Sequence, residues 1–142
     1  MSTVMKKLSS KAPGPEKITV LAVSADSNDQ QSLDSILGME NCSVRGAASC
    51  DEALRLIQEE VPAVVACERE LPDGTWKDLL VLMDNLQDRP PMVVMSRHAD
   101  ERLWAEVLNL GGYDLLAKPL ERIEVARVLG SAWRYGRQPL SA

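Results

Sequence analysis

Four residues capable of ionic or hydrogen-bonding chemistry stand at the ends of apolar stretches, where buried strands would deliver them to one edge of a sheet. They are Ser24 after ITVLAV, Glu68 at the end of PAVVACE, Ser96 at the end of PMVVMS and Lys118 at the end of YDLLAK. A glutamate at the mouth of an apolar strand is costly unless a partner receives its charge. The question is therefore what Glu68 faces, and whether it does chemistry there.

The elements that must position these residues alternate along the chain. Five apolar stretches alternate with five stretches of helical periodicity. The expected strands are 18–23, 42–48, 62–68, 91–96 and 113–118, and the expected helices are 26–40, 49–60, 76–86, 99–112 and 120–136. Strands that are apolar on both faces indicate a parallel sheet covered on both sides. We predict an α/β, three-layer, doubly wound five-stranded parallel sheet with the flavodoxin-like order 2-1-3-4-5. Its functional crevice should lie at the carboxyl ends of the strands.

The expected domain organisation is simple. Residues 1–17 are polar and contain Pro13 and Pro15, so we expect a flexible lead-in; 18–135 form the domain, and 136–142 a tail. Ser49 stands three residues before Glu52, the spacing of a capping box at the start of the second helix. The seven residues after Tyr135 leave no room for an output domain, so we expect output through a partner or a homodimer.

Three segments carry a resemblance to a known family. They are ELPDGTWKDLL, VVMS followed by RHADE, and GGYDLLAKPL. In order and at these spacings they are similar to the receiver domains of two-component response regulators, and the resemblance covers about 18–135. It implies a signalling module rather than an enzyme.

The resemblance implies five functional positions. In the family, two acids after the first strand hold a divalent cation, and an aspartate ending the third strand accepts a phosphoryl group. A Ser or Thr ending the fourth strand and a Lys before a Pro contact that phosphoryl group. Here Ser96 and Lys118 match, but Glu68 stands at the acceptor position and Ser24 and Ala25 at the acidic pair.

These departures argue against phosphorylation by the family's route. Mg²⁺ prefers octahedral oxygen ligands, so without the acidic pair we expect its binding to be weak or absent, and no other cofactor or metal site. Glu68 is one methylene longer than Asp, and a misplacement of about 1 Å costs on the order of 100-fold in rate. We expect Glu68 to face Lys118, with Ser96 donating to its other oxygen. Whether this arrangement mimics the phosphorylated state or is a purely structural ion pair stays open.

Asp26 and Arg97, which lie near this edge, each allow two interpretations. Asp26 could assist in binding a cation, but a cap of the following helix is favoured. Arg97 could cover the pocket or pair with Glu68 or Asp73, or it could point into solvent. The resemblance places the family's aromatic switch residue at Leu115, which is not aromatic, and His98 is expected to be exposed.

Composition excludes several functions. With 16 basic and 21 acidic residues the net charge is −5, which argues against nucleic acid as a partner. There is no apolar run of about 18 residues and no signal peptide, so we expect a cytoplasmic protein without a membrane partner. Three cysteines without metal-ligand spacing are expected to be free thiols.

The leading hypothesis is a single-domain, phosphorylation-independent interaction module. Its partner, or a second copy, would bind the last two helices and the fifth strand. The interface candidates are Trp104, Leu115, Trp133 and Tyr135, although each Trp could instead belong to the core. One alternative is an unusual receiver phosphorylated at Glu68 or Asp73 with weak Mg²⁺ binding. Another is an anion-binding domain of the same fold around Ser24, Ser27 and Asn28.

Overall fold

The computed structural model describes residues 18–38 and 41–137. The expected lead-in over 1–17 lies outside this part of the chain, as do residues 138–142 of the expected tail. Residues 136 and 137 belong to the last helix. No helix in the two described stretches is long and apolar enough to cross a membrane.

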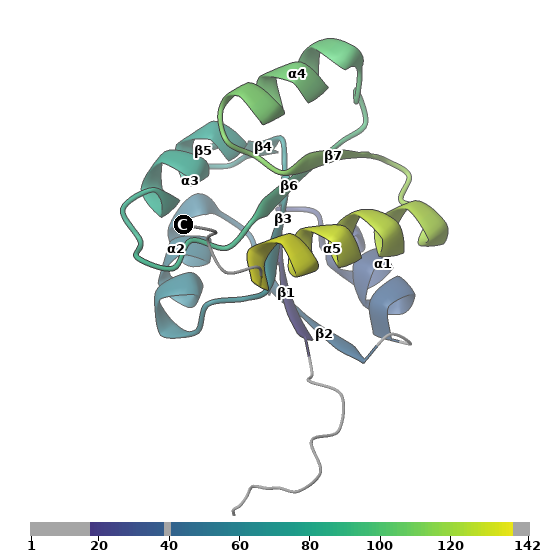
Figure 1. Cartoon of the computed structure of the whole chain (residues 1–142), viewed down its shortest axis with the longest axis horizontal. Coiled ribbons are helices and arrows are strands. Elements are labelled where there is room, and N and C mark those ends of the chain that lie inside the picture. Colours follow the sequence, from purple (N-terminus) through teal and green to yellow (C-terminus); the bar gives the residue numbers. More distant parts are fainter. Residues whose placement is uncertain (1–17, 39–40, 138–142) are drawn as a thin grey trace, which may run out of the picture.

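A five-stranded parallel sheet forms the centre of the fold (Figure 1). Its strands, in chain order, are β1 (Ile18–Val23), β2 (Cys42–Ala47), β3 (Val64–Glu68), β6 (Met92–Ser96) and β7 (Asp114–Ala117). The spatial order is β2-β1-β3-β6-β7. Since β6 and β7 are the fourth and fifth parallel strands, the predicted flavodoxin-like order is confirmed.

Five helices connect the strands and cover both faces of the sheet. They are α1 (Ser27–Leu37), α2 (Cys50–Glu59), α3 (Trp76–Met83), α4 (Glu101–Asn109) and α5 (Arg122–Arg137). Figure 1 shows α1 and α5 on one face, with α2 and α3 on the other. Each of the first four helices is capped by a side chain that accepts a hydrogen bond from a backbone N–H of the first turn. The capping residues are Asp26, Ser49, Thr75 and Asp100. Such caps satisfy amide groups that the helix leaves unpaired.

Two hydrophobic cores follow from the alternation of side chains along each strand. In β1, Val20 and Ala22 pack with α1 and α5, whereas Leu21 and Val23 pack with α2, α3 and α4. All four side chains are buried. Burial on both faces explains why the sequence of this strand is apolar without interruption.

A short antiparallel hairpin follows β3 and was not expected from the sequence. It consists of β4 (Glu70–Leu71) and β5 (Gly74–Thr75), with Glu70 opposite Thr75 and Leu71 opposite Gly74. Pro72 and Asp73 form its tip. The hairpin leads directly into α3, and the Trp76 N–H donates to the Arg69 carbonyl.

Candidate functional site

The parallel register brings the four polar residues of the strand ends to one edge. Glu68 ends β3 opposite Met95 of β6, and Ser96 ends β6 opposite Ala117, the residue before Lys118. Ser24 follows β1, which lies on the other side of β3. Parallel strands that end together bring residues from distant parts of the sequence into one crevice.

Lys118 is the centre of this crevice. Its side chain is only 7% exposed and its Nζ forms an ion pair with Glu68 Oε2, the partner expected from the sequence. A second carboxylate, that of Asp29, lies 2.9 Å from the same Nζ through Oδ2. Lys118 is therefore bound by two acids, from β3 and from α1.

Asp29 was missed by the sequence analysis. It lies in the first turn of α1, is 6% exposed, and accepts a hydrogen bond of 2.7 Å from the Ser24 hydroxyl besides its contact with Lys118. A signal was present in the sequence, because Asp29 precedes Leu33 and Ile36 by four and seven residues and so shares the buried face of the helix.

Asp26 caps α1 and does not face Lys118 as an accessory ligand. Its side chain is exposed, and Oδ1 accepts the Asn28 N–H at 2.9 Å. The Asp26 N–H donates to the Ser24 Oγ at 3.0 Å, which orients that hydroxyl toward Asp29. Ala25 is exposed and supplies no polar side chain.

The expected hydrogen bond from Ser96 to Glu68 is wrong. Ser96 is buried, but its Oγ accepts the His98 N–H at 3.0 Å and makes no hydrogen bond to Glu68. Its role here is local, because this bond turns the chain after β6. Arg97 and His98 are exposed, and Arg97 forms no ion pair within the described residues, so it pairs with neither Glu68 nor Asp73.

The electrostatics of the crevice keep Lys118 charged. Burial alone would lower its pKa, but hydrogen bonds to Glu68 and Asp29 outweigh burial and raise the pKa above its usual value of 10.5. Two carboxylates against one ammonium leave the cluster with one net negative charge when all three groups are ionised. An incoming phosphoryl group would meet that charge.

The residues of the crevice do not fit the divalent cation that the family resemblance implies. Ser24 and Ala25 supply no carboxylate, and both acids that are present, Asp29 and Glu68, bind the Lys118 ammonium. Across residues 18–38 and 41–137, no three His, Cys, Asp or Glu side chains are grouped so as to hold a metal ion.

Asp73, the alternative acceptor, is bound elsewhere. Its two carboxylate oxygens accept the N–H groups of Cys50 and Asp51 at 2.8 and 3.1 Å, at the start of α2. These bonds lower the pKa of Asp73 below its usual value of 3.8. The hairpin that carries Asp73 is thereby tied to α2.

The four interface candidates do not share one surface, which corrects the expectation. Trp104 and Leu115 line an open depression of about 350 Å³ between α4, β7 and α5. Trp133 lines a cavity between α1 and α5 instead. Tyr135 packs on Tyr113, with ring centroids 5.3 Å apart. Only the first pair lies where α4 and β7 meet.

Known proteins resemble this chain over most of its length. The sequence profile of the response regulator receiver domain matches residues 20–129. The DNA-binding transcriptional regulator NtrC of Proteus hauseri is 24% identical over 130 residues, 89% of this chain and 28% of NtrC. The response regulator protein PilR of Pseudomonas aeruginosa is 23% identical over 114 residues, 80% of this chain and 26% of PilR. The chain thus matches only about a quarter of the length of these relatives.

Solved structures share the fold. A two-component response regulator from Clostridium difficile is 25% identical, with a TM-score of 0.75, over 85% of this chain and 99% of that one. The beryllofluoride-activated NtrC4 receiver domain dimer is 23% identical, with a TM-score of 0.75, over 83% of this chain and 98% of that one. Together with the profile match and the sheet order, these similarities show that the chain belongs to the response regulator receiver domain family.

Proposed function

We propose that this receiver domain acts as a signalling interaction module that does not depend on phosphorylation. The observation that carries the proposal is that Glu68 and Asp29 together hold the Lys118 ammonium. In the family pattern the corresponding Lys contacts a phosphoryl group. Here two carboxylates of the chain itself make that contact.

The geometry opposes transfer to Glu68 in two ways. Its Oε2 binds the Lys118 ammonium, so only the other carboxylate oxygen is left to attack a phosphoryl group, at the end of a side chain one methylene longer than Asp. No acidic pair follows β1 to hold the cation that offsets phosphate charge, because Ser24 and Ala25 stand there. Transfer to Asp73 is opposed by the two amide N–H groups that bind its oxygens.

The test is incubation of the full chain with Mg²⁺ and acetyl phosphate, followed by its intact mass. We expect no phosphoryl adduct, and no change in tryptophan fluorescence on adding Mg²⁺. The matched positive control is the triple variant Ser24→Asp, Ala25→Asp, Glu68→Asp, which restores the family's acids and should acquire an adduct and respond to Mg²⁺.

An adduct on the unaltered chain would overturn the proposal. If the adduct maps to Glu68 or Asp73, the chain is instead an unusual receiver with a displaced or lengthened acceptor. If it maps to neither, the crevice described above is not where phosphate enters.

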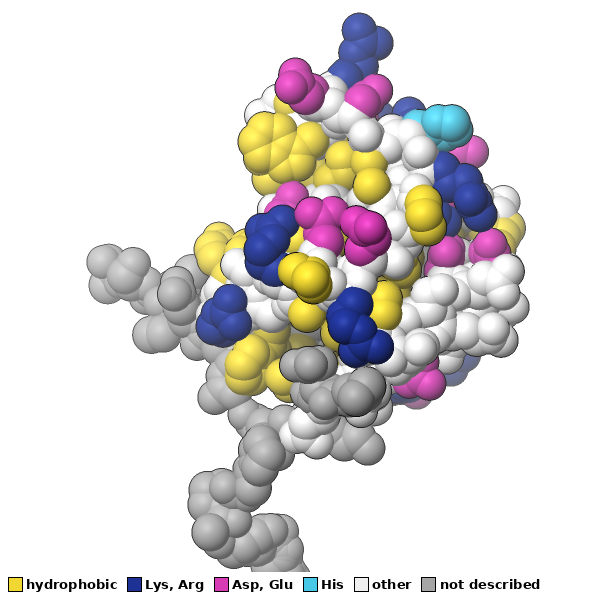
Figure 2. Space-filling model, turned by 90° about the vertical axis from the view of Figure 1, so that its right-hand side faces the viewer, with side chains coloured by type: hydrophobic (Ala, Val, Ile, Leu, Met, Phe, Trp, Pro, Cys, Tyr) yellow, Lys and Arg dark blue, Asp and Glu magenta, His cyan; other side chains and the backbone are white. Residues whose placement is uncertain are grey.

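We further propose that output passes through the surface formed by α4, β7 and the start of α5. Trp104 of α4 is 48% exposed, and Ile123 in the first turn of α5 is 82% exposed. Three acids, Asp100, Glu101 and Glu124, line the depression beside Trp104. Figure 2 shows hydrophobic and acidic side chains side by side on one face of the molecule.

An exposed apolar centre with charged surroundings is the usual composition of a protein-binding surface. The NtrC4 receiver domain is described as a dimer. By analogy, the partner of this surface is a second copy of the chain or another protein. The proposal for the surface is independent of that for the crevice, since the two are tested by association and by mass respectively.

A further inference from the structure

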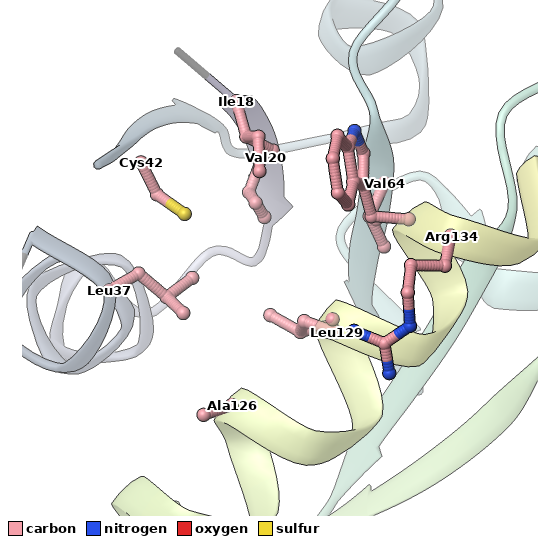
Figure 3. A pocket seen from close by; sticks show the side chains of 10 residues that line it. Ile18, Val20, Leu37, Cys42, Val64, Ala126, Leu129 and Arg134 are labelled. Atoms are coloured by element: carbon pink, nitrogen blue, oxygen red, sulfur yellow. The ribbon is translucent and has the colours of Figure 1, made fainter. Parts of the chain in front are cut away.

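A second pocket lies between α1 and α5 at the amino ends of the strands, whereas Lys118 lies at their carboxyl ends (Figure 3). Its volume is about 220 Å³. The first residues of β1, β2 and β3, the end of α1 and one face of α5 form its walls. The lining residues are Ile18, Val20, Leu37, Cys42, Val64, Ala126, Leu129, Gly130, Trp133 and Arg134. No part of the phosphorylation site of the family resemblance contributes to it.

The interior of this cavity is apolar. Val20, Leu37, Val64 and Leu129 are all buried and belong to the core shared by α1 and α5. Figure 3 shows their side chains around an open space, with Ala126 on the α5 side. An apolar group that enters this partly open pocket would remove apolar surface from water, which favours its binding.

The single charged side chain in the wall is Arg134. It makes no ion pair or hydrogen bond with any residue in the described part of the chain. Its Nη1 lies 3.5 Å from the place where a Cβ on Gly130 would stand, so the guanidinium lies back along α5.

We propose that the cavity binds a small amphiphilic carboxylate, with its hydrocarbon part between α1 and α5 and its carboxylate on Arg134. A guanidinium matches a carboxylate in a two-pronged hydrogen-bonded pair. A ligand with both features contacts the apolar walls and places its carboxylate on the solvent-exposed Arg134 guanidinium.

The volume sets the size of the ligand. A cavity of about 150 Å³ holds benzene, so by proportion 220 Å³ holds about nine non-hydrogen atoms. An unbranched acyl chain of about eight carbons, or a benzene ring with a short acidic arm, fits this space.

The positive charge of Arg134 favours a carboxylate ligand over residues 1–17 of the chain as the occupant of the cavity. Residues 1–17 end next to Ile18 in the cavity wall and contain Val4, Met5 and Leu8 as apolar side chains. They also contain four lysines and one glutamate, which gives a net charge of +3. A basic segment would place like charge beside Arg134, whereas a carboxylate complements it.

The experiment uses the full chain with octanoate as the probe and 1-octanol as the uncharged match. Cys42 lies in the cavity wall, so alkylation by iodoacetamide, mapped by peptide mass, reports occupancy; buried Cys50 and Cys67 serve as internal references. At octanoate concentrations tenfold above its Kd, we expect Cys42 to react about tenfold more slowly. Fluorescence of Trp133 should change over the same concentration range.

Two variants separate the contributions. Arg134→Gln should weaken octanoate about fivefold and leave 1-octanol unchanged, because only the carboxylate loses its partner. Ala126→Leu fills the cavity from α5 and should abolish protection by both probes. The phosphoryl adduct test on the same variants should be unaffected, so failure here is distinguishable from failure of the proposed function.

Three outcomes would overturn the proposal. Octanoate could fail to protect Cys42, or octanoate and 1-octanol could bind equally well in wild type and Arg134→Gln. Cys42 could also be protected without any probe and become reactive on Leu8→Asp, which would assign the cavity to the chain's own first residues.

Discussion

At the scale of single residues, the decisive feature is one ammonium shared by two carboxylates. Glu68 supplies the partner at the position of the family's acceptor, and Asp29 supplies a second acid from α1. Removing one partner of a buried ion pair is destabilising mainly because the other charge stays buried without compensation. Loss of Lys118 should therefore be costly, since Glu68 would lose its ion-pair partner and Asp29 would keep only the Ser24 hydroxyl.

The first prediction concerns Lys118→Met. It should lower the free energy of unfolding by about 3–5 kcal/mol, measured by urea denaturation at pH 7. Lys77→Met is the matched control, because Lys77 pairs with Glu106 at an exposed site and should cost under about 1 kcal/mol. Equal losses in the two variants would show that the Lys118 cluster does not stabilise the fold.

The pH dependence of that difference follows from the raised pKa of Lys118. A base whose pKa is higher in the folded state stabilises fully below its unfolded value, about pH 10.4, and loses this contribution as pH rises through the folded value. The gap between wild type and Lys118→Met should stay constant up to about pH 10 and narrow above it.

The second prediction concerns the thiols. Burial and the nearby Asp73 raise the pKa of Cys50 to about 11. The thiolate is the reactive form, so alkylation at pH 8 should modify Cys42 and spare both Cys50 and Cys67.

The same shift has a stability consequence. Between about pH 9 and 11 the unfolded chain releases the Cys50 proton while the folded chain keeps it, so stability should fall with rising pH. Cys50→Ala should reduce this slope in urea denaturation. An unchanged slope, or ready alkylation of Cys50 at pH 8, would contradict the raised pKa.

At the scale of elements, Asp73 joins the hairpin of β4 and β5 to α2. The start of a helix carries unpaired N–H groups and a partial positive charge, and a carboxylate satisfies both. Helix α2 thus has two caps, its own Ser49 and Asp73 from 22 or more residues away. This tie fixes the segment that follows Glu68.

The third prediction concerns Asp73→Asn. It should speed hydrogen exchange at the Cys50 and Asp51 amides, measured by NMR or mass spectrometry, because a neutral amide oxygen is a weaker acceptor. Glu70→Gln, an exposed change in the same hairpin, is the control and should leave both amides protected.

Low pH should weaken the same hydrogen bonds as Asp73→Asn does. The pKa of Asp73 is lower in the folded state, so its contribution is present above about pH 3.9 and is lost as pH falls through the folded value. Rapid exchange of the two amides at neutral pH in the wild-type chain would contradict the tie.

At the scale of the whole molecule, three regions are separated by the sheet. The ion cluster lies at the carboxyl ends of the strands, the Arg134 cavity lies at their amino ends, and the α4–β7–α5 surface lies along one side. Among the described residues, Ile123 at the start of α5 is the most exposed of the large apolar side chains. Association is therefore the property that tests it.

The fourth prediction concerns Ile123→Ser and Trp104→Ala. Both should weaken concentration-dependent self-association, measured by sedimentation equilibrium, because each removes exposed apolar contact area. Val81→Ser is the control, since Val81 is 64% exposed on α3, away from this surface. If the wild-type protein stays monomeric at every concentration, self-association through this surface is excluded, and the partner would have to be a different protein.

The sequence by itself determined the element order, the sheet order and the edge that carries the site. Periodicity is local and so indicates the elements, parallel strands must end at a common edge, and the order of the strands was predicted as the flavodoxin-like form of a doubly wound sheet. The same logic brought Glu68 and Lys118 together across 50 residues. The Ser49 cap of α2 was readable for the same reason, since donor and acceptor lie within one turn.

Only the tertiary structure decided which further side chains meet at that edge. Asp29 reaches Lys118 across 89 residues because the rotation of α1 about its axis turns its first buried position toward the strand ends. The Ser96 hydroxyl turned to the His98 amide, a choice among torsions that no spacing encodes. Trp133 shares the face of Ala126 and Leu129, at spacings of seven and four residues, and so faces α1 rather than the surface near Trp104. Strand ends follow from pattern, whereas helix rotation and side-chain torsion depend on packing in three dimensions.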